Sequence, residues 1–241
     1  MMRLRSWGAV LGAVLVSGLL AACASGATGA EPTPTPTQSA TRAPTPVDPL
    51  SGVTVLVATA TSLQLVDAEG AVIEEFAYLD QPEQVLAAIE QVFDAAPVDE
   101  ERPGSNHTPP STAHTWGEVE IEVRHYDEEQ REAEQIGLSW PRFAVYFDAP
   151  EYDGVELTTP SGVHAGDAFA DLETELDPED WTCVGSAVDV VTLDEYVELQ
   201  GGMVEREYGV ALHHDGWNAT PADDAAVVWI GAPFAVADGC A

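Results

Sequence analysis

Hydrophobic and polar residues alternate along parts of the chain in the manner of β-strands. Apolar side chains occupy every second position of 118–123, which is typical of a strand with one solvated face. The runs 53–57 and 143–147 are rich in β-branched and aromatic residues and predict buried strands. A hairpin is expected from 62–66 to 71–73 around a turn at 67–70, and later strands at 187–192, 208–213 and 225–230.

Two other stretches carry apolar residues at helical spacing, 82–95 and 167–176. Asp80 and Glu83 give the first a start that resembles a capping box, and Pro97 follows its end. Between the two predicted helices lies a polar loop that contains 103–106 and 109–110. The predicted apolar faces are equivalent: Leu86, Ile89 and Phe93 in the first helix, and Phe169, Leu172 and Leu176 in the second.

One offset of 83 residues relates these two helices and also superposes 144–150 on 227–233, and both segments end in Ala-Pro. We therefore expect an α+β domain over 52–241, with antiparallel sheets and two packed helices, as a tandem duplication of a β-α-β-β unit. The repeats would be 53–150 and 151–241. This arrangement is similar to the tandem helix-and-sheet units of secreted β-lactamase inhibitory proteins and small outer-surface lipoproteins, a likeness of architecture that implies little about function.

The segment before the domain has the features of an export signal and a stalk. Arg3 and Arg5 precede an uncharged apolar run over 7–22, and 24–51 is dominated by Pro, Thr, Ala, Ser and Gly. The sequence Leu20-Ala21-Ala22-Cys23 resembles the lipobox of bacterial prolipoproteins. The resemblance implies a signal peptide over 1–22, lipidation of the Cys23 thiol, and attachment to the extracellular face of the cytoplasmic membrane through that anchor. Residues 23–51 would then be a lipidated linker.

The composition of the chain limits the classes of partner and the kinds of chemistry that we expect. The chain has 42 acidic residues against 8 arginines and no lysine, for a formal net charge of −34. Such a surface repels phosphate backbones, which argues against nucleic acid. Without lysine there is no P-loop lysine, Schiff base or Ser-x-x-Lys nucleophile. Of the three cysteines, Cys183 and Cys240 remain after lipidation of Cys23, and outside the cytoplasm they predict a disulfide.

No catalytic motif is present, and no cofactor or metal site is predicted. His213 and His214 lie together, but on a regular strand they would point to opposite faces. An acidic turn at 148–154 offers oxygens to calcium without EF-hand spacing, and a solvated surface explains it equally. Trp229 lies in an apolar run and is expected in the core. Trp140 and Trp217 adjoin turns, where an indole either binds a sugar or protein or is partly covered by a loop.

These observations favour a non-catalytic surface lipoprotein whose domain binds a protein, peptide or glycan. Two alternatives stay open. One is an extracytoplasmic solute-binding lipoprotein, which usually needs a larger two-lobed domain. The other is a cell-wall hydrolase that uses carboxylates or a metal, which would need convergent acidic side chains in a cleft.

Overall fold

Strands make up most of the computed structural model, which describes residues 49–105, 108–127, 129, 138, 140–172, 181–182, 185–199, 202–214 and 225–236, all within the compact unit Thr45–Ala241. Within these described residues, two helices and a short 3-10 turn accompany the strands. In chain order the elements are η1 (Pro49–Gly52), β1 (Val53–Ala58), β2 (Ser62–Asp67), β3 (Val72–Ala77), α1 (Pro82–Phe93), β4 (Val98–Arg102), β5 (Ser111–Trp116), β6 (Val119–Arg124), β7 (Phe143–Phe147), β8 (Glu151–Tyr152), β9 (Val155–Thr158), α3 (Phe169–Leu172), β10 (Trp181–Thr182), β11 (Gly185–Leu199), β12 (Gly202–His214) and β13 (Val227–Ala235).

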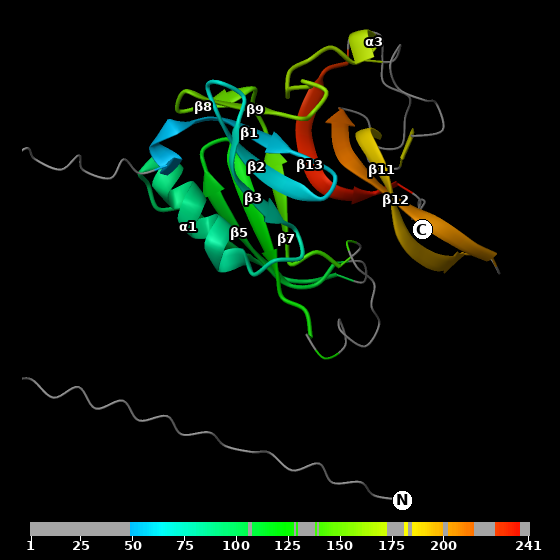
Figure 1. Ribbon diagram of the computed structural model, residues 1–241. Helices are drawn as coiled ribbons and strands as arrows, with labels where there is room; N and C mark the ends of the chain where they lie inside the picture. The colour runs from blue at the N-terminus through cyan, green and yellow to red at the C-terminus, as the bar shows by residue number, and fades with distance from the viewer. Residues whose placement is uncertain are drawn as a thin grey trace, which may run out of the picture. The chain divides into compact units, whose positions relative to one another are not determined.

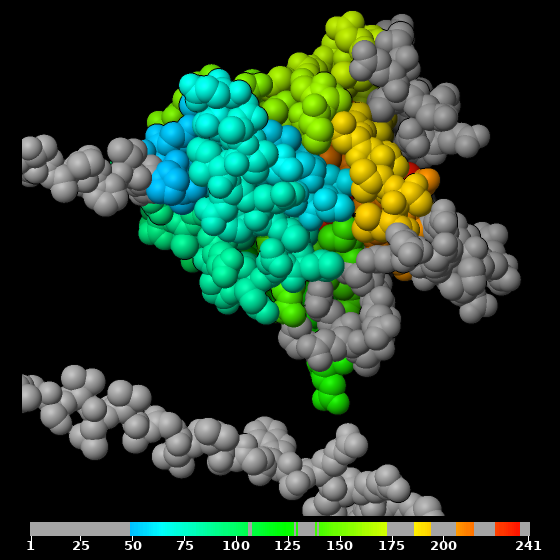
Figure 2. Space-filling view, in the orientation of Figure 1, coloured from blue at the N-terminus to red at the C-terminus, as the bar shows by residue number. Residues whose placement is uncertain are grey.

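The first sheet has five strands in the order β3-β2-β1-β9-β8 (Figure 1). All its pairs are antiparallel except β1 with β9, which run parallel. The predicted hairpin is confirmed as β2 and β3, with Leu63 opposite Phe76. In Figure 2 the blue-to-cyan atoms of β1, β2 and β3 hide most of β5 and β7, which Figure 1 shows behind them.

The second sheet has eight strands in the order β10-β11-β12-β13-β7-β6-β5-β4, and every pair is antiparallel. It consists of two four-stranded meanders, each preceded by a helix, that meet where β7 pairs with β13. At this joint Phe147 lies opposite Ile230, two positions that the 83-residue offset equates. The first sheet lacks this symmetry, because β1, β2 and β3 come from one half and only the short β8 and β9 from the other. The duplication itself remains a prediction.

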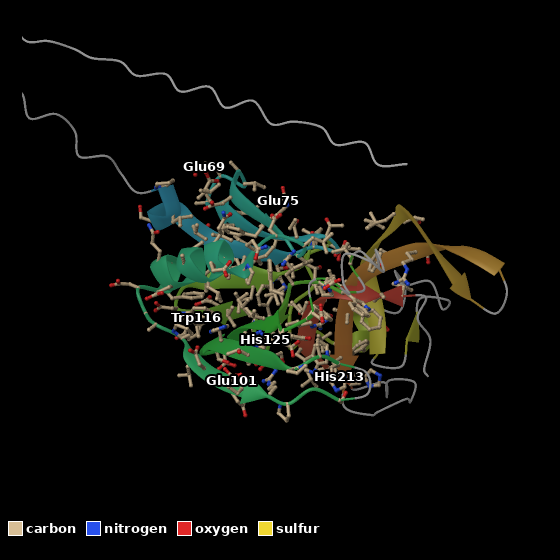
Figure 3. All side chains as sticks on the ribbon, turned by 90° about the horizontal axis from the view of Figure 1, so that it is seen from below. Glu69, Glu75, Glu101, Trp116, His125 and His213 are labelled. Carbon is tan, nitrogen blue, oxygen red and sulfur yellow. The ribbon has the colours of Figure 1, made fainter. Side chains whose placement is uncertain are left out.

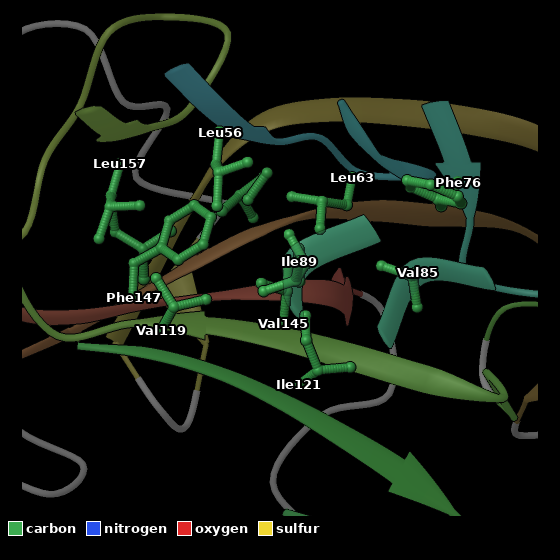
Figure 4. Close-up of a cluster of buried hydrophobic side chains, with 14 of the residues drawn as sticks. Leu56, Leu63, Phe76, Val85, Ile89, Val119, Ile121, Val145, Phe147 and Leu157 are labelled. Atoms are coloured by element: carbon green, nitrogen blue, oxygen red, sulfur yellow. The ribbon is translucent and has the colours of Figure 1, made fainter. Parts of the chain in front are cut away.

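A single hydrophobic core joins the two sheets (Figure 4). Leu56 and Leu63 reach into it from the five-stranded sheet, Ile89 from α1, and Ile121 and Phe147 from the eight-stranded sheet, and none of these five has exposed surface. Burying a side chain of this size contributes roughly 1.5–3 kcal/mol to stability. The fold is therefore the predicted α+β arrangement of antiparallel sheets with two helices.

Several local predictions need correction. The capping box is absent: Gln81 is the N-cap without a side-chain bond, and the Asp80 carboxylate instead accepts a hydrogen bond from the Ala77 backbone. Strands β4 and β5 flank the loop predicted at 103–110 and were not expected. The second helix is described only over Phe169–Leu172, because 173–180 lie outside the described residues. Strands β11, β12 and β13 extend beyond their predicted limits.

Candidate functional site on the outer face of the eight-stranded sheet

The two faces of the eight-stranded sheet differ sharply in chemistry. Val119 and Ile121 on β6 and Val145 and Phe147 on β7 point into the core. The residues between them point to the opposite side, because successive strand side chains alternate. We call this side the outer face. Its ordered side chains are Arg102 of β4, Glu120, Glu122 and Arg124 of β6, Tyr146 of β7, His213 of β12 and Trp229 of β13.

Every helix and strand outside the eight-stranded sheet lies on its inner side as far as the structure describes the chain. Leu50 of η1, Phe76 of β3, Ile89 of α1, Leu157 of β9 and Phe169 of α3 are all members of the one core cluster. Within the described ranges, no secondary-structure element is therefore left to cover the outer face. The solvated face of an antiparallel sheet is expected to be polar, and the outer face is polar. Its polar groups are, in addition, held by contacts with one another.

Ion pairs and hydrogen bonds hold the charged groups of the outer face in place. Arg102 donates to both carboxylate oxygens of Glu120, at 2.6 and 2.9 Å, in the bidentate geometry that fixes both side chains. Glu122 accepts hydrogen bonds from Ser111 Oγ at 2.7 Å, Tyr146 Oη at 3.3 Å and Arg124 Nε at 3.4 Å. Burial raises the pKa of Tyr146, so its hydroxyl stays protonated and donates.

An aromatic group continues this network onto the second half of the sheet. The His213 imidazole stacks on the Trp229 indole with a centroid distance of 4.8 Å and an angle of 10°. Tyr146 meets Trp229 edge to face at 5.6 Å. Gly231 lies opposite Tyr146 on β13, and a Cβ atom there would come within 2.7 Å of Trp229 and 2.9 Å of Tyr146. Because Gly231 has no Cβ atom, both rings can pack against the backbone of β13 at this position.

A cavity of about 240 Å³ opens between the charged network and the aromatic group, lined by Arg102, Glu120, Tyr146, Asp148 and Trp229. Asp148 follows β7 and is exposed. Its pKa is raised, first by partial burial and then by the neighbouring carboxylates of Glu120 and Glu118. The cavity thus combines an aromatic wall with acidic groups that repel one another.

Tyr126 and Trp140 border the outer face at the end away from this cavity. Their rings stack with centroids 5.1 Å apart, and the Tyr126 side chain hydrogen-bonds Arg124. Trp140, a predicted binding residue, is half-buried there. The other predicted binding residue, Trp217, lies outside the described residues, as do Cys23, Cys183 and Cys240.

Three of the histidines that the structure describes have separate hydrogen-bond partners. His114 contacts Asp99 at 2.7 Å, His125 contacts Thr112 at 2.8 Å, and His164 contacts Glu156 at 2.9 Å. Within the described ranges no group of three or more His, Cys, Asp or Glu side chains suits a metal ion. His164 also borders a second cavity of about 440 Å³, together with Pro150, Glu151, Ala165, Gly166 and Asp167.

His213 and His214, predicted to point to opposite faces of a strand, have different neighbours in the structure. The pairing register shifts between them, so their ring centroids lie 6.3 Å apart at an angle of 21°. A bulge of this kind breaks the simple alternation of side chains. His214 is buried against Phe169, whereas His213 stays with Trp229.

The prediction of Trp229 as a core residue is wrong. The apolar residues beside Trp229 in the sequence did not show which side of the strand it occupies. Ile230 faces the core, so Trp229 next to it faces outward and is only half-buried. Part of the site was visible in the sequence: the alternation over 118–123 already places Glu120 and Glu122 on a wet face. Nothing in the sequence indicated that Arg102 would pair with Glu120 across 18 positions.

No protein-family model, curated protein or solved structure matches this chain. Neither of the helices that the structure describes is long and apolar enough to cross a membrane. The functional argument therefore depends on the geometry of the outer face.

Proposed function

We propose that this chain is a membrane-anchored, non-catalytic binding protein whose outer face holds a protein partner. The observation that carries the proposal is the ordered outer face itself. Arg, Trp and Tyr are the residues that most often dominate binding energy at protein interfaces. Here Arg102 is fixed by its ion pair with Glu120, and Tyr146 and Trp229 contact each other, on a sheet face that no described helix or strand covers. Fixed side chains lose little conformational entropy on binding.

The charge of the chain favours a basic partner. Its 42 acidic residues against 8 arginines give a strongly negative field, which attracts cationic surfaces and accelerates their association. Attachment through Cys23 and a proline-rich linker over 24–51, both inferred from the sequence, would hold the domain at a distance from the membrane surface.

Contacts within the site argue against the hydrolase alternative. A glycosidase-type mechanism needs two carboxyl groups available to the substrate, one as acid and one as base or nucleophile. Glu120 is engaged at both oxygens by Arg102, which leaves Asp148 as the available carboxyl group among the residues lining the cavity. At the outer-face cavity, size disfavours the solute-binding alternative, because pockets for small molecules commonly span about 300–1,000 Å³ and this cavity is smaller.

The proposal is tested by comparing capture of surface proteins by the full-length chain and by variants of its two sheets. His213→Ala removes an aromatic contact from the outer face, and Val72→Ala changes an exposed residue of the five-stranded sheet. We expect partners retained by the wild type and by Val72→Ala to be lost or weakened by His213→Ala, with circular dichroism showing both variants folded. Equal retention by both variants would contradict the proposal, and so would cleavage of a cell-wall polymer by the wild type.

A further inference from the structure

The carboxylates around the outer-face cavity outnumber its cations. Arg102 is the cation that lines it, and this guanidinium already serves Glu120 and, at 3.7 Å, Glu100. Asp148 and Glu118 are both exposed, and their backbones are joined by a 3.0 Å hydrogen bond, which keeps the two side chains near each other. One guanidinium thus stands among four carboxylates. The resulting excess of negative charge would be relieved by one further cation.

The aromatic wall of the cavity also suits a cation. Trp has the most favourable ring face for cation binding, and the attraction strengthens when the site is partly desolvated. Trp229 is half-buried, is held by His213 and Tyr146 and lines the cavity together with Asp148, so this wall does not need to form on binding. The volume of about 240 Å³ leaves room for the end of one long side chain.

We propose that this cavity is a subsite for a primary ammonium or guanidinium group, the tip of a Lys or Arg side chain presented by a basic protein partner. The cationic group would lie against the Trp229 indole and contact the Asp148 carboxylate, and Glu118 would add longer-range attraction. Arg102 and Tyr146 act as positioning residues, because they hold Glu120 and Trp229 at the cavity walls. The inference rests on the proposed function and names the chemistry that the outer face recognises.

The test follows the indole ¹H–¹⁵N signal of Trp229 in the full-length chain, assigned by its loss in Trp229→Phe. The probes are Nα-acetyl-lysine amide and its neutral counterpart Nα-acetyl-norleucine amide. We expect the lysine probe to move the Trp229 signal saturably and the norleucine probe to leave it in place. Asp148→Asn should weaken lysine binding by about threefold to tenfold. Glu69→Gln, which removes one charge from the opposite side of the molecule (Figure 3), should leave it within about twofold.

The subsite would be overturned by no movement of the Trp229 signal, by equal movement with both probes, or by equal weakening in Asp148→Asn and Glu69→Gln. A neutral chitin or cellulose oligomer that moves the signal when lysine does not would also overturn it, in favour of a glycan site. The two proposals fail separately. Lysine binding at Trp229 without any outer-face-dependent capture overturns the proposed function alone, and capture that Asp148→Asn leaves intact overturns the subsite alone.

Discussion

Replacing Gly231 by alanine tests whether the aromatic group of the outer face is as tightly packed as the structure indicates. The added Cβ would lie 2.7 Å from Trp229 Cζ3 and 2.9 Å from Tyr146 Cδ1 and Cε1, well inside van der Waals contact. Neither ring can move away from the added Cβ without losing a contact. Trp229 is backed by the His213 imidazole at 4.8 Å, and the Tyr146 hydroxyl is bonded to Glu122.

Two opposing effects set the magnitude. Alanine restricts the unfolded chain more than glycine does, which favours folding by about 0.4–1 kcal/mol where the backbone accepts it. Overpacking a well-filled site costs about 1–3 kcal/mol. The clash is larger, so we expect Gly231→Ala to lower the free energy of unfolding by about 1–2 kcal/mol. For a domain of this size that corresponds to a fall in Tm of roughly 2–8 °C.

The assay is urea and thermal unfolding of the full-length chain, followed by circular dichroism, with Gly52→Ala as the matched control. A Cβ at Gly52 would meet only Ile73 Cδ1 at 3.9 Å, so this variant should be neutral or slightly more stable. The Trp229 indole signal should also move in Gly231→Ala. If Gly231→Ala unfolds like Gly52→Ala and leaves that signal unchanged, the close packing of Trp229 and Tyr146 on β13 is refuted.

Three further predictions concern other positions. Asp148→Asn should stabilise the fold slightly at neutral pH, because the folded pKa of Asp148 is raised above its ordinary value of 3.8 and its ionised form is therefore disfavoured, although solvent screens this exposed group. This gain should vanish as the pH falls through the raised pKa to below 3.8, and a gain independent of pH in urea titrations would contradict it. Gly117→Ala should destabilise by more than Gly231→Ala, since Gly117 has a φ of +54° and a Cβ there would collide with the Tyr152 ring; equal unfolding midpoints would argue against this. Cys183→Ser should lower stability by about 4 kcal/mol if Cys183 and Cys240 form the predicted disulfide, whereas a free thiol titration of two per wild-type domain would exclude the bond.

Local patterns predicted the elements whose side chains obey one simple period. The alternation over 118–123 and the apolar run over 143–147 correspond to β6 and β7, and α1 begins at Pro82 as expected. Strands β4 and β5 lacked such a signal. The burial pattern of β4 is exposed at four of its five positions, since it is an edge strand, and its sequence Val-Asp-Glu-Glu-Arg is typical of a solvated loop. Only pairing with β5 makes it a strand.

The candidate site was harder to foresee because it depends on pairing between distant segments. Arg102 and Glu120 come from β4 and β6, which β5 separates, and Tyr146 meets Trp229 only through the pairing of β7 with β13. The tryptophans chosen from the sequence were those near turns, on the expectation that turns expose side chains. Trp229 instead reaches the surface from the middle of the sheet, where strand parity rather than loop exposure determines its direction.

The joint between β7 and β13 makes the site a product of both halves of the chain. Arg102, Glu120, Tyr146 and Asp148 come from the first half and Trp229 from the second, and three paired positions, from Val145 to Phe147, set their relative register. A slip of one residue would turn Trp229 into the core and Ile230 outward, because side chains alternate along a strand. Burial of Ile230, Phe147 and Val145 opposes that slip. The hydrophobic inner face thus fixes the register on which the polar outer face depends, and a polar substitution at Ile230 would damage binding as well as stability.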